Sequence, residues 1–137
     1  MMLRTVQSEP LYHTWEILVV DDEYDSIQVL IQLLHYYGVA VHVARSGREC
    51  LAMLRDMTPT AIIMDLAMPH MTGWLTLEAI RTTSSLATLP VIAITSYHSE
   101  ATELEATAAG FDAYVHKPID IHTFMTTLSD VINRAPD

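Results

Sequence analysis

Short apolar segments alternate along the chain with longer segments whose apolar residues recur every three or four positions. The short segments are 17–20, 39–43, 61–64, 91–94 and 113–115, and each is rich in β-branched or aromatic residues. This composition, with turn-forming or acidic residues at the segment ends, predicts five β-strands. Most of the segments are continuously apolar, which is typical of strands in a sheet that is covered on both faces.

The segments between and after these strands have helical spacing. Ile27, Leu30, Ile31 and Leu34 follow an i, i+3, i+4, i+7 pattern, and Gly38 is expected to end that helix. Further helices are predicted around Cys50–Leu54, from near Gly73 through Ile80, over 100–109 with a stop at Gly110, and near the C-terminus. The apolar face of this last helix comprises Ile121, Phe124, Met125, Leu128, Val131 and Ile132.

Strand and helix therefore alternate five times, which predicts an α/β fold with a doubly wound parallel sheet between two helix layers. In such folds, binding sites lie beyond the carboxyl ends of the strands. The polar start of the chain predicts a flexible tail over residues 1–13, followed by one domain over 14–134 and a short tail over 135–137.

Composition narrows the function classes. The chain has 137 residues, one cysteine (Cys50) and a formal net charge of −10. It has no segment of roughly 20 apolar residues for a membrane helix and no secretion signal, so we expect a cytoplasmic protein that does not bind membranes. The negative charge argues against direct nucleic-acid binding. It suits a divalent cation, although an acidic surface can also serve solubility alone.

Polar residues of distinct kinds follow four of the five strands. Asp21 and Asp22 follow the first, Asp65 the third and Thr95 the fourth, and Lys117, the only lysine, follows the fifth. Clustered carboxylates repel one another unless a hard cation such as Mg²⁺ neutralises them. An ionised aspartate is a nucleophile toward phosphorus, and with an unperturbed pKa of about 3.9 it needs no general base at neutral pH.

These residues carry a family resemblance. Asp21-Asp22, the segment 62–69 (IIMDLAMP) with Gly73 beyond it, Thr95-Ser96, and the segment 114–118 (YVHKP) together resemble the receiver domain of two-component response regulators. The resemblance extends from about Trp15 to Arg134. It implies a flavodoxin-like fold with five helices and strand order 2-1-3-4-5.

The resemblance also implies roles at the carboxylate cluster. Asp65 matches the phosphoacceptor, Asp22 the direct Mg²⁺ ligand, and Asp21 its neighbour that usually binds the metal through water. The backbone carbonyl of Ala67 matches a further ligand, and Mn²⁺ is an alternative metal. Two loop residues that follow, Pro69 and Gly73, match positions that shape the loop after the phosphoacceptor.

Switch roles follow from the resemblance in the same way. Thr95 and Lys117 match the residues that contact the phosphoryl group, and Lys117 is expected to pair with Asp65 before phosphorylation. Tyr114 matches an aromatic switch residue. An equally favoured alternative is that it is an ordinary strand tyrosine, half-buried and without a switch role. Pro118 matches a proline whose preceding peptide bond is often cis. The seven histidines show no ligand spacing, so no metal role is assigned to them.

The implied function is Mg²⁺-dependent acceptance of a phosphoryl group on Asp65 from a sensor histidine kinase or phosphotransfer protein, followed by signalling to an unknown protein target. The chain is not expected to be a turnover enzyme, because an aspartyl phosphohydrolase needs a second acid where Ala67 stands. A phosphorylation-independent interaction module on the same fold is the alternative. A homodimer is compatible with the sequence, but not one built on a basic fourth helix, since Glu100, Glu103 and Glu105 make that helix acidic.

Two further positions concern the phosphoryl lifetime. In the family that the chain resembles, these positions flank the path of the water that removes the phosphoryl group; Ala67 cannot orient that water, and the bulky Tyr97 is expected to shield the site. Slow self-dephosphorylation is therefore predicted. Ser96 replaces a smaller residue common in the family, which would narrow access for the phosphoryl donor.

Overall fold

Five parallel strands form one sheet in the order β2-β1-β3-β4-β5 in the structure, a computed structural model that describes residues 10–134. The strands are β1 (Glu16–Val20), β2 (Ala40–Ala44), β3 (Ala61–Asp65), β4 (Val91–Thr95) and β5 (Ala113–His116). The predicted fold class and strand order are confirmed. Residues 1–9 and 135–137, which make up most of the expected tails, lie outside the described residues.

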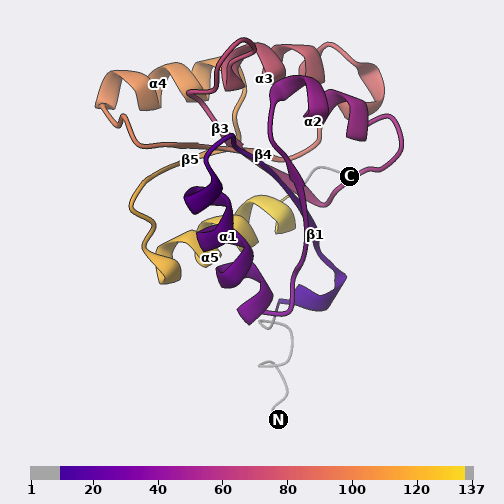
Figure 1. Cartoon of the computed structure of the whole chain (residues 1–137), viewed down its shortest axis with the longest axis vertical. Coiled ribbons are helices and arrows are strands. Elements are labelled where there is room, and N and C mark those ends of the chain that lie inside the picture. Colours follow the sequence, from indigo (N-terminus) through magenta and orange to yellow (C-terminus); the bar gives the residue numbers. More distant parts are fainter. Residues whose placement is uncertain (1–9, 135–137) are drawn as a thin grey trace.

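Five helices cover the sheet on both faces. They are α1 (Tyr24–Tyr36), α2 (Gly47–Met53), α3 (Gly73–Arg81), α4 (Glu100–Ala109) and α5 (Ile121–Asn133). Helices α1 and α5 pack on one face, and α2, α3 and α4 form a layer on the other (Figure 1). The side chains of Ser46, Thr72, Ser99 and Asp120 cap the starts of α2, α3, α4 and α5 by accepting a backbone N–H. Gly110, with φ of 111°, ends α4 as predicted.

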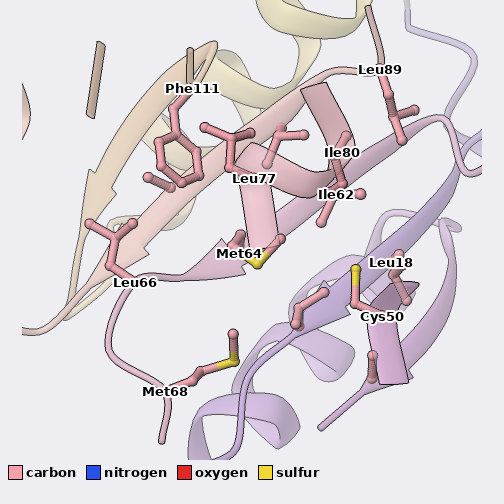
Figure 2. Close-up of a cluster of buried hydrophobic side chains, with 14 of the residues drawn as sticks. Leu18, Cys50, Ile62, Met64, Leu66, Met68, Leu77, Ile80, Leu89 and Phe111 are labelled. Atoms are coloured by element: carbon pink, nitrogen blue, oxygen red, sulfur yellow. The ribbon is translucent and has the colours of Figure 1, made fainter. Parts of the chain in front are cut away.

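The strands are buried on both sides, which explains their continuous apolar sequence. Alternate residues point to opposite faces, so that Leu18 and Met64 pack beneath α2, α3 and α4, whereas Ile17 and Ile63 pack against α1 and α5. Figure 2 shows the first of these clusters, in which Phe111 lies among the side chains of α3 and the strands. Cys50 is fully buried there, and burial raises the pKa of its thiol to about 12, so the thiol stays protonated.

Two details differ from the sequence-based expectations. Tyr12 lies within the expected tail, but it starts a 3-10 helix (Tyr12–Thr14) and packs edge-on against Trp15 and Tyr37, with ring centroids 5.0 and 5.3 Å away. In α5, Phe124, Met125, Leu128 and Val131 are buried, but Ile121 is 55% exposed because it stands at the first turn of the helix.

At the amino edge of the sheet, where the strands begin, Arg81 ties the end of α3 to the starts of β4 and β5. Its guanidinium donates to the backbone carbonyls of Ala87, Leu89 and Gly110 and to Oδ2 of Asp112 at 3.0 Å. Asp112 Oδ2 also accepts the backbone N–H of Val91, the first residue of β4, at 2.8 Å. Positive and negative charge are therefore balanced at this edge, and the donors of Arg81 are engaged.

Candidate functional site

Three carboxylates meet at the carboxyl edge of the sheet, where the strands end. Val20 of β1 is in register with Met64 of β3, so the next residues, Asp21 and Asp65, are brought side by side. One carboxylate oxygen from each of Asp21, Asp22 and Asp65 lies within 4.8 Å of the others. Asp21 is fully buried and Asp65 is 5% exposed, while Asp22 is more open to solvent. The structure thus gathers the predicted acidic residues into one group.

The same local hydrogen bond shapes three of the strand ends. Oδ1 of Asp21 accepts the N–H of Glu23 at 2.9 Å, and Oδ1 of Asp65 accepts the N–H of Ala67 at 3.1 Å. Oγ1 of Thr95 accepts the N–H of Tyr97 at 3.0 Å in the same way. Such side-chain turns form where a strand gives way to a loop. Each side chain therefore holds its own loop while keeping a second oxygen or hydroxyl proton for other partners.

Lys117 reaches this group but pairs differently from the expectation. Its Nζ donates to Oδ2 of Asp21 at 3.2 Å and to Oγ of Ser26 at 2.8 Å, and it lies 3.6 Å from Oε1 of Glu23. Within the described residues, it forms no ion pair with Asp65. The predicted Lys117–Asp65 pair is therefore wrong for this state of the molecule. Lys117 Nζ instead neutralises the fully buried carboxylate of Asp21.

The carboxyl of Asp65 is a weaker acid than that of an ordinary aspartate. Burial and the neighbouring charge of Asp21 raise the pKa of its carboxyl from 3.8 to about 7, against the smaller lowering effects of the Ala67 N–H and of Lys117. The pKa thus lies well above the ordinary aspartate value that the sequence suggested. A nearby cation would favour the ionised, nucleophilic form of this carboxyl.

The carboxylates open into a small cavity of about 120 Å³ lined by Asp22, Glu23, Asp65, Ala67, Ser96 and Tyr97. Tyr97 stands at its rim and is 75% exposed. Gly73 packs so tightly against the backbone of Asp65 and Leu66 that a Cβ atom there would clash with the carbonyl oxygen of Asp65. A side chain at position 73 would therefore displace the backbone that carries Asp65, which accounts for the glycine.

Comparison with known proteins decides the family. The family described as "Response regulator receiver domain" matches residues 17–129. The chain belongs to the response regulator receiver domain family. An uncharacterized 14.6 kDa protein of Leptolyngbya boryana is 37% identical over 105 residues, which are 77% of this chain and 80% of that protein. The transcriptional regulatory protein ZraR of Escherichia coli is 33% identical over 117 residues, and the match spans 85% of this chain but only 26% of ZraR.

The solved structures agree with the fold. The chemotaxis response regulator CheY4 of Vibrio cholerae has 32% sequence identity and a TM-score of 0.79, with 85% of this chain and 98% of that chain covered. Receiver domains are signalling modules of two-component systems, and they interact with histidine kinases or phosphotransfer proteins. No helix within residues 10–134 is long and apolar enough to cross a membrane.

The receiver domain has a donor set that fits Mg²⁺. Receiver domains bind this ion at an acidic pocket, and the group formed by Asp21, Asp22 and Asp65 offers only carboxylate oxygens, the hard ligands that Mg²⁺ prefers. No histidine or cysteine of the described residues belongs to this group. A divalent cation would neutralise the excess negative charge of this group, which adds to burial in raising the pKa of Asp65.

Sequence reasoning missed one residue that touches a predicted switch position. Nδ1 of His98 lies 3.1 Å from the hydroxyl of the half-buried Tyr114, and the His98 ring stacks on His116 with centroids 4.5 Å apart. Burial, with a smaller contribution from the charge of Glu103, raises the pKa of Tyr114, so its hydroxyl keeps its proton at neutral pH. His98 and Tyr114 are sixteen residues apart, and no local spacing in the sequence indicates the contact. The peptide bond between Lys117 and Pro118 is cis, as the resemblance implied.

Proposed function

We propose that Asp65 accepts a phosphoryl group from the phosphohistidine of a sensor histidine kinase or phosphotransfer protein, with Mg²⁺ bound, and that the domain then changes conformation to signal. The observation that carries the proposal is the placement of Asp65. It is buried beside two further carboxylates, has a raised pKa, and lines a cavity at the edge of the sheet. A buried carboxylate cluster of this kind is costly unless a cation neutralises it, and such clusters are typical of functional sites.

In the proposed reaction, an ionised Asp65 oxygen attacks phosphorus and forms an acyl phosphate. The N–P bond of the donor breaks, and its electron pair stays on the imidazole nitrogen. Asp21, Asp22, Asp65 and the backbone carbonyl of Ala67 would hold Mg²⁺ directly or through water. When bound, the ion (Mn²⁺ as an alternative) supplies positive charge to the phosphoryl oxygens.

Lys117 and Thr95 are proposed to stabilise the product. Lys117 already bonds Asp21 across the site, and a phosphoryl group on Asp65 would give its ammonium a closer and more strongly charged partner. The hydroxyl of Thr95 now serves the turn at Tyr97, and it would donate its proton to a phosphoryl oxygen. Because both residues stand at strand ends, their shifts would reach the β4–α4 loop and the start of α5.

Tyr114 is the proposed reporter of that shift. In this structure its hydroxyl is held by His98 near the start of α4, so an inward turn of Tyr114 requires that this hydrogen bond break. A target protein would recognise the changed surface of α4, β5 and α5. We do not propose a dimer that uses basic residues on α4, because Glu100, Glu103 and Glu105 make this helix acidic.

Labelling with a small phosphodonor such as acetyl phosphate tests the proposal. Wild-type protein should gain one acid-stable, base-labile phosphoryl group only when Mg²⁺ is present, and Asp65→Asn should gain none. Lys117→Arg should accept the group but fail to shift the resonances of α4 and β5 in NMR spectra, because a planar guanidinium cannot replace a compact ammonium there.

The opposite result has a clear meaning. Labelling that survives in folded Asp65→Asn would place the acceptor elsewhere. A folded wild-type protein that takes up no label with Mg²⁺ would favour the alternative function, a phosphorylation-independent interaction module.

A further inference from the structure

A cleft between α2 and α3 lies outside the carboxylate site. It has a volume of about 490 Å³ and is lined by Arg48, Leu51, Arg55, His70, Met71 and Leu75. These two helices lie next to each other in the layer that covers one face of the sheet (Figure 1). The proposed phosphoryl transfer uses none of these residues.

The lining of this α2–α3 cleft combines charge with an apolar floor. Arg48, Leu51 and Arg55 follow one another at i, i+3 and i+7, so they share one side of α2 and of the turn that continues it. Leu75 faces the cleft from α3 and is 50% exposed, although it is a large apolar residue. The cleft therefore places an exposed apolar side chain beside two arginines, on a chain with a formal net charge of −10.

The distribution of positive charge singles out this cleft. The formal net charge is −10. Of the cationic side chains that the structure describes, Lys117 and Arg81 form ion pairs, and Arg134 donates to the carbonyl of Asp112. The arginines in residues 10–134 whose side chains form no hydrogen bond or ion pair are Arg45, Arg48 and Arg55. All three lie at or beside α2, so the arginine side chains without a hydrogen bond or ion pair are concentrated there.

We propose that the α2–α3 cleft is a docking surface for an acidic amphipathic helix of another protein. Arg48 and Arg55 are seven residues apart, on α2 and on the turn that follows it, so two carboxylates about two turns apart on a partner helix are suited to pair with them. An apolar side chain between these carboxylates would lie on Leu51, Met71 and Leu75. The negative net charge of the chain disfavours nucleic acid as the occupant. The proposal does not depend on phosphorylation of Asp65.

The test uses the whole chain and a designed probe. The probe is a helical peptide with two glutamates seven residues apart and a leucine between them, and the control peptide has lysines in place of the glutamates. NMR titration should show saturable binding of the glutamate peptide, with shifts confined to α2 and to residues 70–75, and no binding of the lysine peptide. Arg55→Glu should weaken binding about tenfold, whereas Arg45→Glu, the same change of charge just outside the cleft, should weaken it by less than about threefold.

A charge swap completes the experiment. The double variant Arg48→Glu/Arg55→Glu, once circular dichroism shows that it is folded, should bind the lysine peptide instead. Equal effects of Arg45→Glu and Arg55→Glu would overturn the proposal, since they would indicate attraction without a site. Concentration-dependent self-association that Leu104→Glu on the acidic α4 abolishes would also overturn it, because the occupant would then be a second copy of this chain.

Discussion

The two edges of the sheet use the same chemical groups in opposite ways. At the amino edge, one guanidinium meets Asp112 and three backbone carbonyls, and Asp112 also accepts a backbone N–H. At the carboxyl edge, three carboxylates share a single ammonium, that of Lys117, which bonds Asp21 and leaves Asp65 without an ion pair among the described residues. Charge is balanced at one edge and in excess at the other.

The difference shows that the amino edge stabilises the fold, whereas the clustered carboxylates of the carboxyl edge destabilise it. A matched ion pair with every donor engaged fixes the ends of α3, β4 and β5 relative to one another. At the carboxyl edge, burial and the neighbouring charge of Asp21 instead raise the pKa of Asp65 to about 7, so the folded state resists ionising this carboxyl. Ionisable groups with strongly shifted pKa values are typical of functional sites. The ion pair at the amino edge thus holds in place β4 and β5, two strands of the sheet that carries the carboxylates at its other edge.

Removing the cation of the balanced edge should have the largest effect on stability. Arg81→Met keeps the apolar stem but leaves Asp112 and the carbonyls of Leu89 and Gly110 without their charged donor. We expect the free energy of unfolding to fall by about 3 kcal/mol, measured by urea denaturation. Asp65 should still accept phosphate.

Arg134→Met is the matched control, because Arg134 donates only to the backbone carbonyl of Asp112 and lies near the exposed end of α5. Its cost should stay below about 1 kcal/mol. Equal losses in the two variants would show that the amino edge is not the anchor described above.

Neutralising Asp65 should increase the free energy of unfolding, whereas loss of Arg81 lowers it. Because its folded pKa is raised, the folded protein binds more protons than the unfolded chain between about pH 4 and 7, so stability falls as pH rises through that window. Asp65→Asn should flatten this fall and raise the free energy of unfolding at pH 8 by about 2 kcal/mol. A variant that is less stable than wild type at pH 8 and keeps the same pH slope would refute the charge imbalance.

Binding of Mg²⁺ at the carboxyl edge should stabilise the fold by a smaller amount. At pH 7.5, Mg²⁺ at about ten times its dissociation constant should stabilise the fold by about 1.4 kcal/mol, seen as a rise in melting temperature. Asp22→Ala should remove most of that rise. Asp56→Ala, which deletes an exposed carboxylate far from the carboxylate group, should leave it intact.

The smallest effect concerns the lifetime of the acyl phosphate, and it rests on the proposed function. Tyr97 lines the cavity beside Asp65, so Tyr97→Ala should admit water and shorten the lifetime several-fold. Loss of label over time measures it, with Tyr36→Ala as a control at a tyrosine that is 83% exposed on α1. A wild-type lifetime of seconds that Tyr97→Ala does not change would remove the predicted shielding.

The sequence predicted the strands, the helices and the gathering of Asp21, Asp22 and Asp65, because apolar periodicity and parallel topology together determine which chain positions meet at a sheet edge. It did not predict the partner of Lys117, because Asp21 and Asp65 stand side by side in the same acidic pocket and the choice between them depends on the three-dimensional path of the lysine side chain. The contact between His98 and Tyr114 depends on the path of the β4–α4 loop, and the pKa of Asp65 depends on burial. Neither property is encoded in local spacing.

The titration of Asp65 itself tests most directly whether the carboxyl edge is built to receive a cation. The chemical shift of its carboxyl carbon can be followed by NMR in selectively labelled protein, with and without Mg²⁺, and Asp65→Asn identifies the resonance. The account predicts a midpoint near pH 7 without metal, and a midpoint at least about one pH unit lower when Mg²⁺ is bound. A midpoint near the ordinary aspartate value of about 4 in metal-free protein, unchanged by Mg²⁺, would contradict it.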